Sequence, residues 1–299
     1  MNGSQPVLTP PPPALEATSP WPFRAGLLVI GGLLISSFAP VLYRLGEVWL
    51  SDDNMSHGLF VPLTAAYIAY LKRGELAAAQ WKTNYLGLLL VVLGGLMLCV
   101  GPPSIPTFII LGRVAFLFSL TGCLLFLGGF RILWTLAYPL SLLPLMIPFP
   151  FYDFVTLPLQ LVASILSEHS LSALGVSVLR EGNVLFLSGQ TLSVAEACSG
   201  LRSLYSLLFL TLAYAYFFAD TWKLRAALIA AIIPIAIVAN SMRVTATAIL
   251  GGINPEYTHG VYHEMLGWSV FVVAFGMLCL WHWCLMRGEK LFARKGASV

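Results

Sequence analysis

The chain has 299 residues, of which 58% are hydrophobic and only 10% are charged. Soluble domains carry roughly a quarter charged residues, so this composition excludes an ordinary soluble domain and predicts an integral membrane protein. The formal net charge is +3, and no basic face interleaved with aromatic residues is present, which argues against nucleic acid as a partner.

Residues 1–22 are rich in Pro, Ser and Thr and lack a basic start, which predicts a disordered tail rather than a cleaved signal. A membrane domain is expected over residues 23–287, followed by a basic cytoplasmic tail at 288–299. Within it, eight apolar runs are candidates for crossing a hydrocarbon core of ~30 Å. They cover residues 25–43, 59–71, 85–100, 108–130, 132–147, 204–218, 224–250 and 265–286.

The charges between these runs are distributed unevenly, and the positive-inside rule turns that into a topology. With both termini cytoplasmic, 11 of the 16 Lys and Arg residues fall on the cytoplasmic side, and most acidic residues fall on the other. The cytoplasmic bases are Arg24, Lys72, Arg73, Lys82, Arg131, Lys223, Arg225, Arg287, Lys290, Arg294 and Lys295. The sequence therefore predicts an all-α polytopic membrane protein with about eight transmembrane helices.

An extracytoplasmic insertion is expected at about residues 149–199. Residues 154–175 are apolar but interrupted by Glu168-His169, which favours an amphipathic helix on the outer surface over a ninth span. Residues 176–194 are rich in β-branched residues and broken at Gly182-Asn183 and Ser188-Gly189, which are hairpin signals. A small β-hairpin element is therefore predicted just before Cys198.

Cys198 differs from the other four cysteines, which lie inside apolar runs, because polar residues flank it. The five show no CxxC pair or metal-ligand spacing, so neither a metal nor another cofactor is expected. Arg243 lies about 19 residues into the seventh run, or ~28 Å along a helix, and so near the outer face. His263 follows the outer loop. The charge-derived topology thus brings Cys198, Arg243 and His263 to a common depth.

These three side chains match the roles of a cysteine acyl transferase. A nearby imidazolium and guanidinium lower the pKa of a thiol, and a histidine can carry the proton to a leaving amine. An arginine can hold the oxyanion of a tetrahedral intermediate. Each also has a structural interpretation: a small packed cysteine, a snorkelling arginine and an interfacial histidine.

Four short motifs, in the expected order, resemble the exosortase/archaeosortase family of multi-pass membrane cysteine transpeptidases. The most specific is Glu196-Ala-Cys-Ser-Gly-Leu-Arg-Ser203, which resembles the nucleophile motif of that family. Asn240-Ser-Met-Arg243 resembles its arginine motif and His263-Glu-Met-Leu-Gly-Trp268 its histidine motif. Asn54-Met-Ser-His-Gly58 resembles its first outer-loop motif, although Met55 stands where an aromatic residue is expected.

The resemblance implies a catalytic set of Cys198, Arg243 and His263 in a bacterial inner-membrane enzyme. It implies substrates that are exported proteins with a C-terminal sorting signal: a Pro-Glu-Pro-like (PEP-CTERM-like) motif, a transmembrane helix and a basic tail. Cleavage near the motif, through a Cys thioester at the periplasmic face, is expected to release the protein or transfer it to an acceptor.

Four further residues are weaker candidates for substrate binding. Glu196 is a candidate for orienting His263 or binding the substrate, and Arg202 for pairing with Glu196. His57 could line the substrate path or cap a helix, and Asn240 belongs to the arginine motif.

Two other classes of function remain open on the sequence. A transporter, or a component that exports lipid-linked polysaccharide, would also place Arg and His inside the membrane, but nearer to the bilayer midplane. A structural membrane subunit would not need the Cys198 thiol. A membrane metalloprotease is disfavoured because the sequence contains no HExxH.

Overall fold

The computed structural model describes residues 21–100, 106–148, 152–194, 201–258 and 260–296, which are mostly helical. The chain divides into two compact units, residues 1–39 and 40–299. The first contains helix α1 (Trp21–Ser37), and the second contains all the elements that surround the candidate site. The predicted tail lies outside the described residues, except that Trp21 and Pro22 begin α1.

Among the described residues, three helical segments are long and apolar enough to cross a membrane: Ile109–Thr135, Trp222–Ile253 and Gly260–Gly288. A fourth is added if the helical pair Ala25–Ser37 and Ala39–Ser51 counts as one broken span. Shorter apolar helices cover Leu86–Cys99, Ala137–Met146 and Leu204–Phe218. The fold is therefore that of a polytopic membrane protein, while the number of eight spans and their orientation stay predictions.

The first part of the second unit packs around one hydrophobic cluster. Its elements are α2 (Ala39–Ser51), η1 (Asp53–Leu59), α3 (Phe60–Leu71), α4 (Arg73–Ala78), α5 (Leu86–Cys99), α6 (Pro106–Thr135), α7 (Ala137–Leu142) and η2 (Leu143–Met146). Leu45 of α2, Ile68 of α3 and Leu142 of α7 are buried in this cluster, and Phe116 of α6 packs against it. The cluster thereby joins helices that are far apart in the sequence.

Two apolar runs predicted as single spans are broken in the structure. The run at 25–43 is divided between α1 and α2, whose second residue is Pro40, a residue suited to a helix start. The run at 132–147 is divided among the end of α6, α7 and η2, which contains Pro144. The boundary predicted near residue 131 does coincide with a break, because Gly129 inside α6 has φ 69° and ψ −174°.

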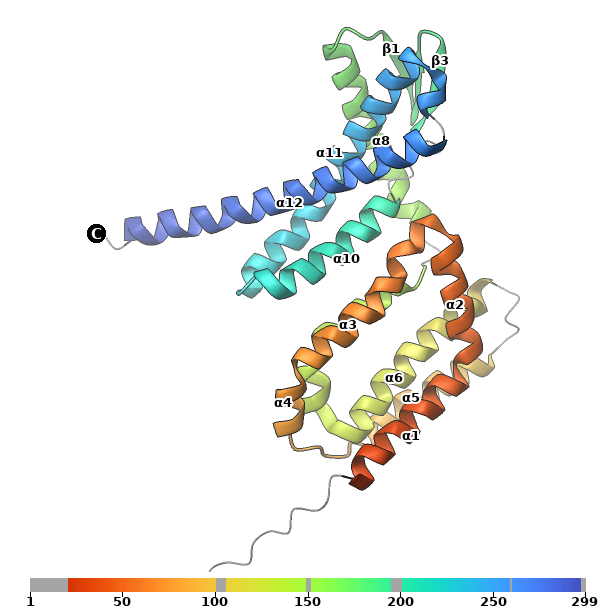
Figure 1. Ribbon diagram of the computed structural model, residues 1–299, viewed down its shortest axis with the longest axis vertical. Helices are drawn as coiled ribbons and strands as arrows, with labels where there is room; N and C mark the ends of the chain where they lie inside the picture. Colours follow the sequence, from red (N-terminus) through yellow and green to blue (C-terminus); the bar gives the residue numbers. More distant parts are fainter. Residues whose placement is uncertain (1–20, 101–105, 149–151, 195–200, 259, 297–299) are drawn as a thin grey trace, which may run out of the picture. The chain divides into compact units, whose positions relative to one another are not determined.

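The second part of the unit is built on α11 (Trp222–Ile253), with helices and a sheet around it (Figure 1). The other elements are α8 (Tyr152–Ala173), β1 (Val178–Glu181), β2 (Val184–Leu187), β3 (Gln190–Ser193), α10 (Leu201–Phe218), η3 (Pro255–Thr258) and α12 (Gly260–Gly296). Leu207 of α10, Leu228 of α11 and Leu278 of α12 share one buried cluster.

The predicted outer helix and β element are both present. The helix corresponds to α8, which packs on α11 partly through Ser167, whose hydroxyl lies 3.2 Å from the Ser241 hydroxyl. The strands form an antiparallel sheet in the order β1-β2-β3. Its two turns fall at the predicted glycines, Gly182 with φ 63° and Gly189 with φ 91°, a backbone region that favours glycine.

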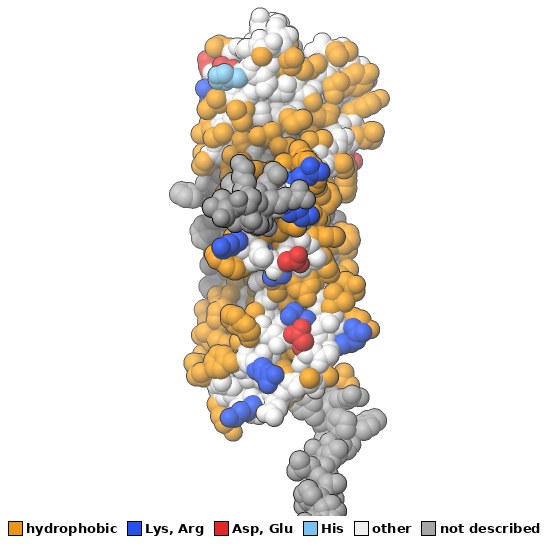
Figure 2. All heavy atoms as spheres, turned by 90° about the vertical axis from the view of Figure 1, so that its left-hand side faces the viewer, with side chains coloured by type: hydrophobic (Ala, Val, Ile, Leu, Met, Phe, Trp, Pro, Cys, Tyr) orange, Lys and Arg blue, Asp and Glu red, His pale blue; other side chains and the backbone are white. Residues whose placement is uncertain are grey.

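The surface agrees with a membrane environment. Figure 2 shows hydrophobic side chains over most of one face of the molecule, with basic and acidic side chains scattered among them. Leu50, Trp134 and Trp268 are among the large apolar side chains that are more than two thirds exposed. Soluble proteins rarely expose so much contiguous apolar area, whereas a lipid-facing surface requires it.

Candidate functional site

The structure describes the predicted site residues to different extents. The side chains of Arg243, Asn240 and His57 are described, whereas His263 and Arg202 are placed only as backbone positions in α12 and α10. Cys198 and Glu196 lie outside the described residues. The site is therefore defined by the elements that lead into and out of the Cys198 motif.

The chain reaches the Cys198 motif from strand β3, which is held against α11. Val194, four residues before Cys198, is fully buried in a cluster that also contains Val244, the neighbour of Arg243. Strand β3 is fixed to the same helix because the Gln190 side-chain amide donates a hydrogen bond to the Ala248 carbonyl, with N···O at 2.7 Å. The last described residue before the motif thus packs beside the part of α11 that carries Arg243.

The chain leaves the motif into α10, which begins at Leu201. One turn into this helix, the Tyr205 ring stacks on the His57 imidazole, with the ring centroids 6.2 Å apart and the planes 8° apart. Further along, Leu207 packs in the buried cluster with α11 and α12. The segment that contains Cys198 therefore connects two fixed points, β3 on α11 and the start of α10.

Arg243 lies against helix α12. A Cβ built on Gly267 would lie 3.4 Å from an Arg243 Nη atom, an ordinary van der Waals distance, so the guanidinium lies close to the α12 backbone at this glycine. Position 263 lies four residues before Gly267, which is one helical turn along the same face of α12. Helices α11 and α12 pack against each other (Figure 1), and the contact at Gly267 sets Arg243 one turn from the backbone position of His263.

His57 joins three elements at the α10 end of this region. It is 6% exposed, and its Nε2–H donates to the Leu145 carbonyl of η2 at 3.2 Å. The next residue, Gly58, packs directly on the Trp49 indole, which leaves no room for a Cβ. That indole donates to the Met146 carbonyl at 2.9 Å. The His57-Gly58 pair therefore holds η1 against η2 and α10, which suggests a positioning role rather than contact with substrate.

The burial of His57 predicts a dependence of stability on pH. Burial lowers the pKa of His57 below its ordinary value of 6.5, and the hydrogen bond to Leu145 opposes that effect only partly. The folded state then resists protonation while the unfolded state accepts it. The free energy of unfolding is expected to fall as the pH drops below about 6.5 and to level off below the folded-state pKa.

This pH dependence can be measured by thermal unfolding in detergent between pH 8 and pH 5, with His57→Phe as the comparison. Phenylalanine keeps a ring against Tyr205 but cannot titrate. The variant should lose about 1–3 kcal/mol at all pH values, because the Leu145 carbonyl loses its donor. Its melting temperature should fall less than that of the wild type between pH 7 and pH 5. Parallel pH profiles would show that His57 is not the group responsible.

Sequence reasoning missed one charged residue in a span, Arg113 of α6. Its side chain is 6% exposed, and in the described part of the chain it forms no ion pair and its Nε makes no hydrogen bond. The signal was available, because a charge inside an apolar run is costly and usually functional.

The Tyr214–His282 pair, with O···Nδ1 at 2.7 Å between α10 and α12, was also missed, since sequence cannot show which spans are neighbours.

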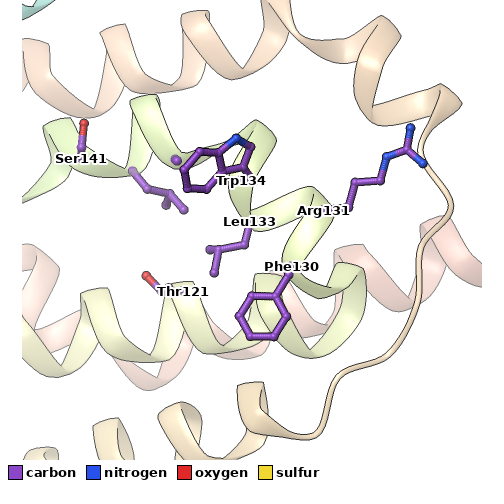
Figure 3. A pocket seen from close by; sticks show the side chains of 8 residues that line it. Thr121, Phe130, Arg131, Leu133, Trp134 and Ser141 are labelled. Carbon is purple, nitrogen blue, oxygen red and sulfur yellow. The ribbon is translucent and has the colours of Figure 1, made fainter. Parts of the chain in front are cut away.

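An open cavity of about 710 Å³ lies elsewhere, beside the end of α6 and the start of α7 (Figure 3). Its lining is mainly apolar and includes Phe130, Leu133 and Trp134, together with Thr121 and Ser141. Trp134 is 84% exposed, so the cavity opens outward. None of the predicted site residues lines it, and its lining offers no nucleophile with a neighbouring base.

Two described features bear on the candidate site. The Arg243 guanidinium lies against α12 one turn from position 263, and Val194, the last described residue before the Cys198 motif, shares a buried cluster with Val244. Among the described residues, no group of three or more His, Cys, Asp or Glu side chains is arranged to hold a metal ion. The four described cysteines are free.

Comparison with known proteins gives one result. The chain matches no curated protein and no solved structure with significance. The family model described as transmembrane exosortase (Exosortase_EpsH) matches residues 49–280, which include all four motifs and every element from η1 to α11. Because this match covers most of the 299 residues, the chain belongs to the transmembrane exosortase family.

Proposed function

We propose that the protein is a membrane-embedded cysteine transpeptidase that cleaves C-terminal sorting signals of exported proteins. The observation that carries this proposal is the position of Arg243. It lies against α12 at Gly267, one turn from the His263 position, and next to Val244, which shares a buried cluster with Val194 just before the Cys198 motif. Membership of the exosortase family supports the same class of chemistry.

The proposed reaction has two steps. In acylation, the Cys198 thiolate attacks the scissile carbonyl carbon, and Arg243 stabilises the resulting oxyanion. The C–N bond then breaks, the leaving amine takes a proton from His263, and a thioester remains on Cys198. In the second step, water or an amine acceptor attacks the thioester after giving a proton to His263, and the thiolate is restored.

The weaker candidates take supporting roles. Glu196 orients His263 or contacts the substrate, and Arg202 pairs with Glu196. His57 positions the start of α10, as its contacts with Tyr205 and Leu145 support. Asn240 lies one turn from Arg243 on the same helix and is considered separately below.

The proposed substrate is an exported protein whose signal contains a Pro-Glu-Pro-like motif, a transmembrane helix and a basic tail. The site then lies at the periplasmic face of the bacterial inner membrane, where the motif emerges from the bilayer. The charge distribution between the apolar runs supports this orientation, because it places the outer loops and the ends of α8 and α11 on that side.

The direct test is detection of the thioester by intact-mass measurement. The protein is reconstituted in proteoliposomes, mixed with a peptide that carries a matched sorting signal, and quenched in acid. The expected result is a mass increase equal to the acyl part of the peptide, located on Cys198 by fragmentation. A protein that is never acylated but moves the peptide or a lipid across the bilayer would instead be a transporter.

A further inference from the structure

Helix α11 carries several buried polar atoms that have no hydrogen-bond partner, and those of Asn240 and Thr247 lie nearest to the face of Arg243. Asn240 is 6% exposed and Thr247 is 1% exposed. The Asn240 Oδ1 and Thr247 Oγ1 atoms are buried and make no hydrogen bond. Asn240, Arg243 and Thr247 occupy positions i, i+3 and i+7 of the helix, which lie on one face. We call these three residues the polar stripe.

Such a stripe is costly within a membrane-spanning helix. Each buried polar atom without a partner forfeits the hydrogen bond that it would make with water, and the apolar run on both sides offers no replacement. The neighbouring Ser241 hydroxyl, in contrast, is satisfied by Ser167 of α8. Asn240 and Thr247 lie on the face of α11 that also carries Arg243, whereas Thr245, whose hydroxyl is likewise unpartnered, lies on another face.

The chemistry of the stripe fits a polypeptide backbone. A carboxamide and a hydroxyl are neutral groups that both donate and accept, as is needed to pair with peptide N–H and C=O groups. From Asn240 to Thr247 the helix rises by ~10 Å. That length is spanned by about three residues of an extended peptide. The guanidinium of Arg243 stands between the two, where the proposed oxyanion forms.

We propose that the polar stripe binds the sorting-signal backbone on both sides of the scissile bond, with Thr247 on the acyl side and Asn240 on the leaving side. This inference rests on the proposed function. In the predicted topology α11 runs outward, so Asn240 lies deeper in the membrane than Arg243 and Thr247 lies further out. The transmembrane helix of the signal follows the motif, so the backbone after the scissile bond descends past Asn240.

The two contacts act at different times in the reaction. During acylation the bond from the Cys198 sulfur to the carbonyl carbon forms while the C–N bond breaks, and the protonated amine departs with the signal helix. Asn240 then has no ligand, whereas Thr247 still holds the acyl part of the thioester. Asn240 is therefore needed only for attack on substrates that possess the leaving-side backbone.

The experiment compares two substrates in proteoliposomes. One is the full signal peptide, and the other is an aryl ester of its acyl part, which lacks the leaving-side backbone. Thioester formation on Cys198 is followed by quenched mass measurement in single turnover. Asn240→Ala should be acylated about tenfold more slowly by the full signal but within about twofold of the wild-type rate by the ester.

Two further variants test the assignment. Thr247→Val should slow acylation by both substrates, because the acyl side is common to them. Thr211→Val is the matched control. Its hydroxyl is also buried without a partner, but it lies ~15 Å beyond the start of α10 at Leu201, so both rates should stay unchanged.

The outcomes separate this inference from the function on which it rests. If Asn240→Ala slows acylation equally with both substrates, or with neither, the assignment of Asn240 to the leaving side is wrong. The thioester formed by the wild type would still support the transpeptidase. Failure of the wild type to form a thioester with the full signal would overturn both.

Discussion

Cys198→Ala is expected to abolish processing of a sorting-signal substrate while the protein still inserts and folds. Without the thiol no thioester can form, and the four described cysteines belong to α5, α6 and α12, not to the segment between β3 and α10. Replacing the thiol by a methyl group should change the free energy of unfolding by no more than about 1 kcal/mol.

The measurement is cleavage of a tagged substrate by variants normalised for expression, with melting temperature recorded in parallel. Cys99→Ala is the matched control, because Cys99 is free and exposed at the end of α5 and should be dispensable. Wild-type cleavage by Cys198→Ala would show that the nucleophile has been assigned to the wrong residue. It would also favour a structural subunit or a transporter.

Arg243→Lys is expected to lower turnover by about 10²–10³, or roughly 3–4 kcal/mol of transition-state stabilisation. Lysine keeps the positive charge but replaces a planar fork with a compact ammonium. The guanidinium lies close to α12 at Gly267, and the ammonium of lysine would not place its donors at the same points.

The alternative is an arginine that only anchors the end of α11 at the membrane surface, and such a residue would tolerate lysine with little change. Arg131→Lys provides the control, since Arg131 is exposed beside the cavity at the end of α6. Cleavage in proteoliposomes and thermal stability should be measured for both variants. Near-normal turnover of a well-folded Arg243→Lys would reduce Arg243 to an anchor.

The local signals in the sequence predicted local structure well. Gly182 and Gly189 mark turns that need positive φ, and the structure has both, with the strands between them in antiparallel register. The helix interrupted by Glu168 is also present as α8. The composition was enough to predict a polytopic membrane protein.

Apolar length alone did not predict continuous helices. The run at 132–147 satisfies a hydropathy window, yet it is divided among three helical pieces, one of which contains Pro144. The break just before this run lies at Gly129, where a Cβ would lie 2.7 Å from the Lys82 carbonyl oxygen. Such contacts depend on tertiary neighbours that the sequence does not reveal.

The chemistry of the candidate site stays a prediction from the sequence, whereas its supports are found only in the structure. Motif spacing and charge predict Arg243 near the outer end of a span, and the contact with Gly267 sets it one turn from the His263 position. The stack of His57 on Tyr205 joins residues 148 positions apart, and the burial of Arg113 depends on neighbouring helices. Neither could be found from periodicity in a single chain.

The family match begins at residue 49, and the structure suggests why. Trp49, at the start of the match, makes contacts specific to an indole: it packs on Gly58 and donates to the Met146 carbonyl. The buried Leu45 just before it fills apolar volume, which other apolar residues can also supply. An exchange of Trp49 is therefore expected to disturb Gly58 and His57 as well, whereas an apolar exchange at Leu45 is expected to be absorbed by repacking of its neighbours.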